Sequence, residues 1–299
     1  MAVGGERTVI DDAYWPGPEH SVVLVSADGD IWEPATPPGA MWLSSVAYGH
    51  GLFVAVGDGV FVSQDGRDWR DPSDDVRGSF AEVAYGNGVF VVLTSDGSTH
   101  TSTDGEQWSS SGSPVIERGA GVVFGAGAFV AWSGAGDLAV STNGLSWDPV
   151  EIAGVNPDEL LEVRAVSVID GAFVGIVNQD PWFVAGVAPT SEVIRNYVEI
   201  TSRDGRAWTV SGPRMPPILS ESQSGDGYVG LDCERFTLHH SADGSAWSSA
   251  LGEAYAVVQS GGRFVAVGRD HVLSSRDGRV WEPVFVHDPT SLSPPRAQR

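Results

Sequence analysis

Apolar and polar residues alternate along most of this chain, in short runs that end at glycine-rich turns. In Ser44–Trp69, "SSVAYGHGLFVAVGDGVFVSQDGRDW", one apolar run ends at Gly-His-Gly, a second at Gly-Asp-Gly and a third at Asp-Gly; a short fourth run carries the tryptophan. Period-two alternation between such turns is typical of antiparallel strands. The pattern predicts four strands, A to D, and no segment has sustained helical periodicity.

The same unit recurs along the sequence, marked by S-x-D-G-x-x-W six times and S-x-N-G-x-x-W once. The motif tryptophans are Trp32, Trp69, Trp108, Trp147, Trp208, Trp247 and Trp281. Their successive spacings are 37, 39, 39, 61, 39 and 34 residues. A unit of this size corresponds to one four-stranded propeller blade, and the spacing of 61 indicates an insertion of roughly twenty residues.

The motif itself predicts a structural role at the hairpin between strands C and D. Asp-Gly or Asn-Gly favours a two-residue type I′ turn. The serine hydroxyl and the aspartate carboxylate can bond nearby backbone groups, and the tryptophan can cover the hairpin. We therefore expect Ser26, Asp28, Ser63, Asp65 and their counterparts to stabilise turns rather than to form a catalytic or metal site.

This seven-fold motif resembles the Asp-box, or BNR repeat, of sialidase-like β-propellers, over residues from about Ser21 to Trp281. The resemblance implies an all-β, seven-bladed β-propeller of four-stranded antiparallel blades, with residues 1–286 as one domain and 287–299 as a flexible tail. The last unit contains its own four runs. The first blade must then draw strands A and B from residues 1–20, where Arg7–Trp15, "RTVIDDAYW", is the candidate.

Composition narrows the classes of partner. The 299 residues carry a net charge of −22 and include no lysine, so the chain repels phosphate backbones and anionic membranes. We expect no nucleic acid and no membrane partner. Cys233 is the only cysteine, which excludes an internal disulfide. The first residues lack a signal-peptide pattern, so we expect a cytoplasmic protein, secreted only if a signal has been removed, and a monomer because a closed ring leaves few sheet edges.

One end of the blades should carry the binding site. The B–C turns and D–A connections lie opposite the motif hairpins and include the longest loops. They include the insertion Asn178–Val198 in blade 5, and a segment before it in which Asn156 could begin a short helix. Aromatic and charged residues at this end, or at the entrance of strand A, are the candidate ligand-binding residues: Trp15, Trp132, Arg164, Trp182, Arg195, Tyr197, Arg269, Asp270 and His271.

Two acidic residues of strand A, Glu82 and Glu221, are weak catalytic candidates. Charges that point into a propeller channel either arrange a ligand or are simply solvated. Trp182 and Tyr197 could equally stack on a ligand or anchor the insertion. The histidines His100, His239 and His240 are expected to pack or to be exposed rather than to bind metal. No metal, phosphate or nucleophile-elbow motif is present, so we expect no cofactor and no metal.

Three functions remain. The leading hypothesis is a non-catalytic propeller that binds a protein or a small ligand at the tunnel mouth. The first alternative is a sialidase-like glycoside hydrolase or lyase using Glu82 and Glu221, whose carboxyls would have to lie about 5 Å or about 6.5–9.5 Å apart. The Arg-Ile-Pro motif of enzymatic sialidases is missing, so the resemblance supplies no catalytic residue. The second alternative is a lectin, although the B–C turns do not repeat one residue set.

Overall fold

The computed structural model describes residues 2–5, 21–35, 43–72, 76, 78–154, 162–178, 197–213, 218–224, 227–232, 236–244, 246–260, 262–268 and 271–286. These residues form 27 strands in seven sheets and contain no helix. Accordingly, no helix in the described ranges is long and apolar enough to cross a membrane. Two compact units are present: residues 1–25 with 33–220, and residues 26–32 with 221–299.

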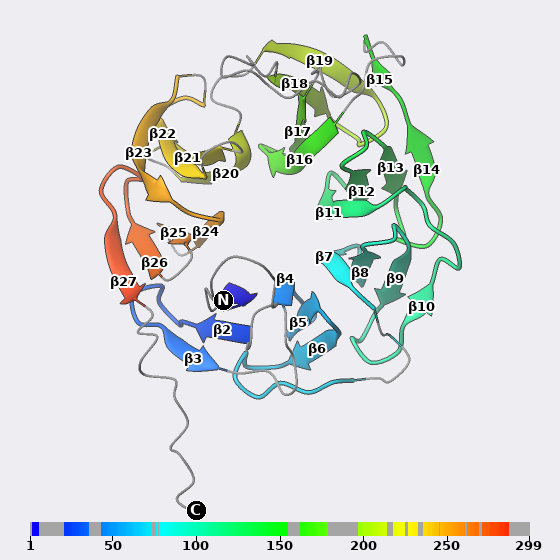
Figure 1. Cartoon of the computed structure of the whole chain (residues 1–299), viewed down its shortest axis with the longest axis horizontal. Helices are drawn as coiled ribbons and strands as arrows, with labels where there is room; N and C mark the ends of the chain where they lie inside the picture. Colours follow the sequence, from blue (N-terminus) through cyan, green and yellow to red (C-terminus); the bar gives the residue numbers. More distant parts are fainter. Residues whose placement is uncertain are drawn as a thin grey trace, which may run out of the picture. The chain divides into compact units, whose positions relative to one another are not determined.

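The sheets follow one another along the chain (Figure 1). The first two contain β1 (Ala2–Gly5), β2 (Ser21–Val25) and β3 (Glu33–Ala35), then β4 (Leu43–Gly49), β5 (Leu52–Gly57) and β6 (Val60–Ser63). The next two contain β7 (Phe80–Gly86), β8 (Val89–Thr94), β9 (Thr99–Ser102) and β10 (Ser109–Ser110), then β11 (Gly119–Gly125), β12 (Ala128–Ser133), β13 (Leu138–Ser141) and β14 (Asp148–Val150).

The remaining three sheets complete the chain. The fifth contains β15 (Ile152–Ala153), β16 (Glu162–Ile169), β17 (Ala172–Asn178), β18 (Tyr197–Ser202) and β19 (Trp208–Pro213). The sixth contains β20 (Ile218–Ser224), β21 (Gly227–Asp232), β22 (Thr237–Ser241) and β23 (Ser248–Glu253). The seventh contains β24 (Ala256–Ser260), β25 (Arg263–Val267), β26 (His271–Ser275) and β27 (Glu282–Val286).

The six sheets from β4 onward follow the predicted A-B-C-D meander of antiparallel strands. In the second sheet, strand D is reduced to a bridge between Val62 and Arg70. In the fifth, β15 adds a parallel fifth strand beside β19. The four-stranded blade is therefore confirmed in outline. The first sheet is an exception, because it has three strands in the described part of the chain.

The N-terminal residues differ from the prediction. The strand that pairs with β2 is Ala2–Gly5, in the register Ala2↔Leu24 to Gly5↔Ser21. The proposal that Arg7–Trp15 supplies this neighbouring strand is therefore wrong, and that segment lies outside the described residues. Glycine-rich "AVGG" carries little β signal because glycine is depleted in strands, which explains why the pattern did not identify it.

Type I′ turns occur in the meander, but at a different place from the one predicted. At the A–B turns, His50 and Gly51 have φ of 54° and 75°, and Asn87 and Gly88 have 49° and 79°. Two consecutive positive φ values are the requirement of type I′. At the motif hairpins only the glycine has positive φ, as at Gly66 (76°), so the type I′ prediction for Asp-Gly is wrong.

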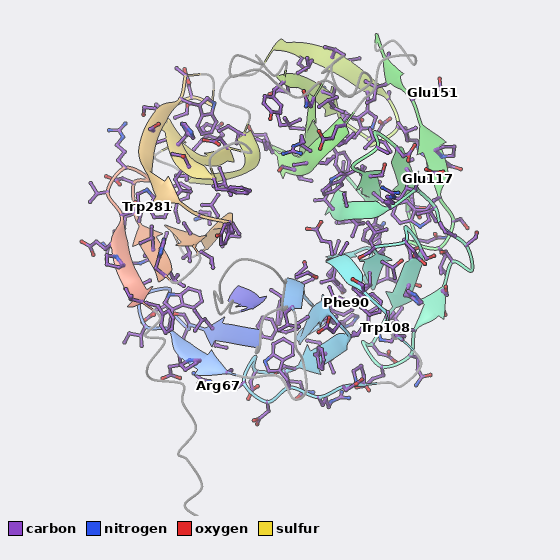
Figure 2. The ribbon with its side chains drawn as sticks, viewed as in Figure 1. Arg67, Phe90, Trp108, Glu117, Glu151 and Trp281 are labelled. Atoms are coloured by element: carbon purple, nitrogen blue, oxygen red, sulfur yellow. The ribbon has the colours of Figure 1, made fainter. Side chains whose placement is uncertain are left out.

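Neighbouring sheets pack through an aromatic residue placed on a glycine. The ring of Tyr85 on β7 lies where a side chain on Gly49 of β4 would be, 2.3 Å from an added Cβ. Phe124 of β11 lies in the same way on Gly86 of β7, 2.1 Å from its added Cβ. Between these inner contacts the cores are apolar, with fully buried residues such as Phe90 of β8 (Figure 2). Glycine is needed at these positions because any Cβ would overlap the neighbouring ring.

Candidate functional site

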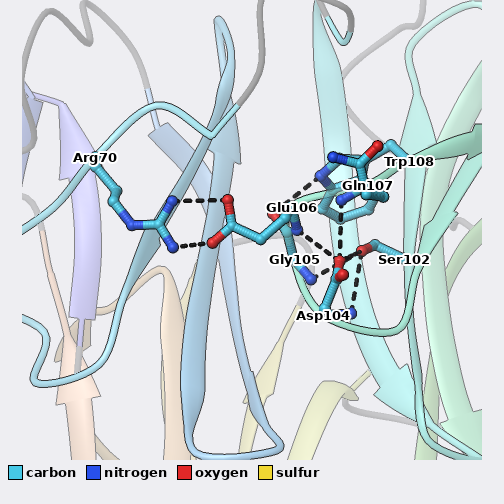
Figure 3. Close-up of polar contacts among 7 residues, drawn as sticks. All are labelled: Arg70, Ser102, Asp104, Gly105, Glu106, Gln107 and Trp108. Carbon is cyan, nitrogen blue, oxygen red and sulfur yellow. Dashed lines mark hydrogen bonds and ion pairs between the residues drawn. The ribbon is translucent and has the colours of Figure 1, made fainter.

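The motif hairpins are held by a closed set of hydrogen bonds, which we call the staple (Figure 3). In the third sheet, Asp104 accepts the backbone N–H groups of Glu106 at 2.8 Å and Gln107 at 2.9 Å. The hydroxyl of Ser102 donates to Asp104 and accepts the N–H of Gly105 at 2.8 Å. The indole N–H of Trp108 donates to the carbonyl of Gly105 at 3.1 Å.

All seven motifs form this staple. The indole N–H donates to the motif glycine in each, at 2.7–3.1 Å, and Trp281 is a second example labelled in Figure 2. Donation by two backbone amides lowers the pKa of the carboxyl group in five staples, those of Asp28, Asp65, Asp104, Asp204 and Asp277. The structural role predicted for the motif is confirmed, because each acid already accepts bonds from its own turn.

Charged residues beside the staples join neighbouring hairpins. The residue after a motif glycine pairs with the residue after the preceding motif tryptophan: Arg67 with Glu33, Glu106 with Arg70, and Arg206 with Asp148. Both oxygens of Glu106 face the guanidinium of Arg70 (Figure 3). Because these side chains are largely exposed, each pair contributes little to the stability of the fold.

Among the acidic residues that the structure describes, Glu82 has a carboxyl group that is strongly desolvated. Its Oε2 accepts the backbone N–H of Val122, on the next inner strand β11, at 3.1 Å. An added Cβ on Gly121 would lie 2.1 Å from the indole of Trp132 and 2.5 Å from this same oxygen, so indole and carboxylate share the bare face of Gly121. Glu82 keeps some accessible surface, but burial of its carboxyl raises the pKa to about 7. A carboxyl with this pKa could donate a proton near neutral pH.

A repeated backbone feature explains how Glu82 reaches that position. The register of strand A shifts by one residue near its start in β4, β7, β11 and β16. Such a β-bulge re-aims the following side chain. Ser45 occupies in β4 the position of Glu82 in β7, and its hydroxyl accepts the N–H of Val83 at 3.4 Å. Glu82 therefore also has a structural function, to cap a backbone amide of the next sheet.

The insertion in the fifth sheet connects β17 to β18, and these two strands are paired up to their ends. Asn178, the last residue of β17, pairs with Tyr197, the first of β18, and also with Glu162 of β16, so these three residues follow one another across the sheet end. Arg164 forms an ion pair with Glu162 here. Tyr197 is 2% exposed and Trp132 is 7% exposed, so both belong to the core rather than to an open stacking surface.

In the second unit, an exposed aromatic pair lies at the end that carries the B–C turns. Phe236 directly precedes β22 and Tyr255 directly precedes β24; their ring centroids are 5.7 Å apart with planes at 80°. Phe236 is 40% exposed and Tyr255 is 53% exposed. Phe236 has a φ of 53°, a left-handed conformation that bulky residues rarely adopt. Neither residue was predicted, since "CERF" and "YAVV" look like ordinary flanks of buried strands.

Two buried contacts support this pair. The carbonyl of Phe236 accepts the N–H of Ala254 at 2.8 Å. At the base of the same B–C turn, Nε2 of His239 lies 2.7 Å from Oδ2 of Asp232, with both side chains largely buried. The expectation that His239 packs is thus confirmed. His240 is also buried, and desolvation lowers its pKa, as it does for His100.

The other candidates are distributed as follows. His271 begins β26 and is half-buried, at the end of the sheet where Tyr255 precedes β24. The N–H of Tyr255 donates to the carbonyl of Val267. Glu221 lies on β20, but its side chain is outside the described part of the structure, so the predicted carboxyl pair is not tested. The candidates that fall wholly outside the described residues are Trp15, Trp182, Arg195, Arg269 and Asp270, together with the helix proposed at Asn156. Within the described ranges, no group of three or more possible ligands could hold a metal ion.

Comparison with known proteins identifies the fold. No family model and no curated protein matches the chain, so the Asp-box assignment remains a resemblance. The structure is similar to YCF48 bound to D1 peptide, with 14% identity, a TM-score of 0.61 and coverage of 87% of this chain and 88% of that one. It is similar to YCF48 from Cyanidioschyzon merolae, with 17% identity, TM-score 0.54 and coverage of 83% and 85%. It is also similar to streptogramin B lyase, with 8% identity, a TM-score of 0.61 and coverage of 89% of this chain and 87% of that one. At these identities the similarity shows the fold alone, a β-propeller.

Proposed function

We propose that this chain is a non-catalytic β-propeller that binds an exposed peptide segment of a protein partner, with Phe236 and Tyr255 as the anchoring side chains. The aromatic pair carries this proposal. Exposed aromatic residues at a turn are typical anchors of protein interfaces, because they bury a large area at small entropic cost. A strained backbone angle at Phe236 adds a cost that a binding function would explain.

Two further observations support a peptide ligand. One similar propeller, YCF48, is bound to a D1 peptide, which is a property of that protein and a precedent for this fold. The staples occupy the other end of the blades, and their polar groups are already used by their own turns. Six sheets, from β4 onward, follow the blade meander, so seven complete blades are not found among the described residues. We also propose that the three-stranded sheet β1-β2-β3 is a further, incomplete blade, because it carries a staple like the others.

A displayed library of random peptides tests the proposal. Peptides selected on the wild-type protein should bind at least about tenfold more weakly to the double variant Phe236→Ser/Tyr255→Ser, since losing a buried aromatic anchor costs more than about 1 kcal/mol. Tyr48→Ser is the matched control. Tyr48 is a 59% exposed aromatic residue of β4, and it lies beside an A–B turn, at the end of the blade opposite to the B–C turns. Its binding should equal that of the wild type. If nothing is selected, or if the double variant binds equally well, the proposal is wrong.

The hydrolase alternative retains one specific observation, the raised pKa of Glu82. Two features favour the structural explanation of that residue: it caps Val122, and Ser45 does the same without any acid chemistry. Turnover of aryl glycosides that disappears in Glu82→Gln would favour the hydrolase. The binding proposal predicts no turnover in either protein.

A further inference from the structure

We infer that the partner segment presents an arginine side chain to the rings of Phe236 and Tyr255. This inference rests on the proposed function and names the chemistry that the site would select. Aromatic ring faces carry partial negative charge, so an exposed face attracts a cation. The two rings meet edge to face, at 80°, and leave about half of each residue exposed.

The charge of the chain favours the same choice. A net charge of −22 attracts cationic segments over a long range and repels acidic ones. The chain contains no lysine, and several of its arginines are already paired with acids, among them Arg67, Arg70, Arg206 and Arg263. The excess of carboxylates therefore has to be balanced from outside, by mobile ions or by a cationic partner.

Arginine fits this surface better than lysine. Its planar guanidinium can stack on a ring while its N–H groups keep hydrogen bonds in the plane, and it loses less hydration than a compact ammonium group. The aliphatic stem of an arginine can also cover the apolar edge of one ring while its charged end stays at a ring face.

The test compares two short random peptide libraries that are identical except for one fixed central residue, arginine in one and citrulline in the other. Citrulline keeps the planar shape and the aliphatic stem of arginine but has no charge, and a carbonyl oxygen replaces one of the guanidinium nitrogens. The wild-type protein should retain the arginine library about threefold to thirtyfold more strongly, the range expected for a cation on an aromatic face. The preference should shrink at high salt, because the long-range part is screened.

A double variant, Phe236→Leu/Tyr255→Leu, separates the ring faces from apolar bulk. It keeps hydrophobic side chains without the aromatic charge distribution, so it should bind both libraries but lose the preference. Equal retention of the two libraries by the wild type would overturn this inference and leave the peptide-binding function standing. Retention of neither library would overturn both. A preference that persists in the leucine variant would place the arginine elsewhere and would also refute the inference.

Discussion

Replacing Glu82 by glutamine should make the protein more stable at alkaline pH. Burial raises the pKa of Glu82 from 4.5 to about 7 in the folded protein. The folded state therefore holds a proton that the unfolded state has already lost, and wild-type stability falls as the pH rises from about 4.5 to about 7. Glutamine cannot ionise, and its amide oxygen can still accept the N–H of Val122. The variant should escape this loss.

The size of the effect follows from the shift. A difference of about 2.5 pKa units corresponds to at most about 3.4 kcal/mol, at about 1.36 kcal/mol per unit. Glu82 retains some accessible surface, so solvent screening reduces the figure. We expect the free energy of unfolding of Glu82→Gln to exceed that of the wild type by about 1–3 kcal/mol near pH 8.5, and by much less near pH 5.

Urea unfolding at several pH values measures this difference directly, provided that the slope of the transition does not change. Glu106→Gln is a control of opposite sign. Its hydrogen bond to Arg70 lowers the pKa of Glu106, so its ionised form stabilises the fold and its replacement should destabilise above the unfolded pKa. A Glu82→Gln variant that is less stable at alkaline pH would show that the ionised carboxylate helps the fold, and the reasoning would fail.

Three other changes test the framework. Asp104→Ala removes the acceptor of two backbone amides and should lower the unfolding free energy by about 1–2 kcal/mol without changing peptide affinity; equal stability in urea would contradict the staple. Gly86→Ala places a Cβ 2.1 Å from the ring of Phe124 and should destabilise by about 1–3 kcal/mol, with partial recovery when Phe124→Leu is added. Arg70→Glu and Glu106→Arg should each lower the free energy of unfolding slightly, and the double variant should recover it. A double-mutant cycle should give a coupling energy of about 0.2–1 kcal/mol.

The repeat could be predicted from the sequence because its cause is local. Spacing, alternation and the Ser-Asp-Gly-Trp motif all act within one hairpin. The prediction of the turn type was wrong for a reason that is also local. Asp104 accepts the N–H groups of the residues two and three positions ahead, which gives a longer turn than type I′. The pairs of positive φ values occur instead at His50-Gly51 and Asn87-Gly88.

The candidate site was harder to predict because exposure depends on neighbouring strands. Trp132 was placed at a B–C turn and lies near the end of β12, whereas Tyr197 was placed inside the insertion and instead begins β18. Both are buried, Trp132 over Gly121 and Tyr197 opposite Asn178. Phe236 and Tyr255 have the residue types of a core and are nevertheless exposed. Alternation along a strand shows which residues share a face, but it does not show what covers the end of the sheet.

The bulge near the start of strand A explains how the repeated framework accommodates different chemistry. One position after the bulge holds Ser45 in β4, Glu82 in β7 and Gly121 in β11. The first two accept an amide of the next sheet, and the third makes room for the indole of Trp132. A serine hydroxyl performs this capping without a buried charge, so a glutamate at the same position costs stability at alkaline pH that a serine would not cost. Glu82→Ser removes the buried carboxyl and keeps a hydroxyl that can accept the N–H of Val122, as Ser45 accepts that of Val83. Its free energy of unfolding should therefore exceed that of the wild type at alkaline pH. A serine variant that is less stable there would show that the longer side chain is needed to reach the amide.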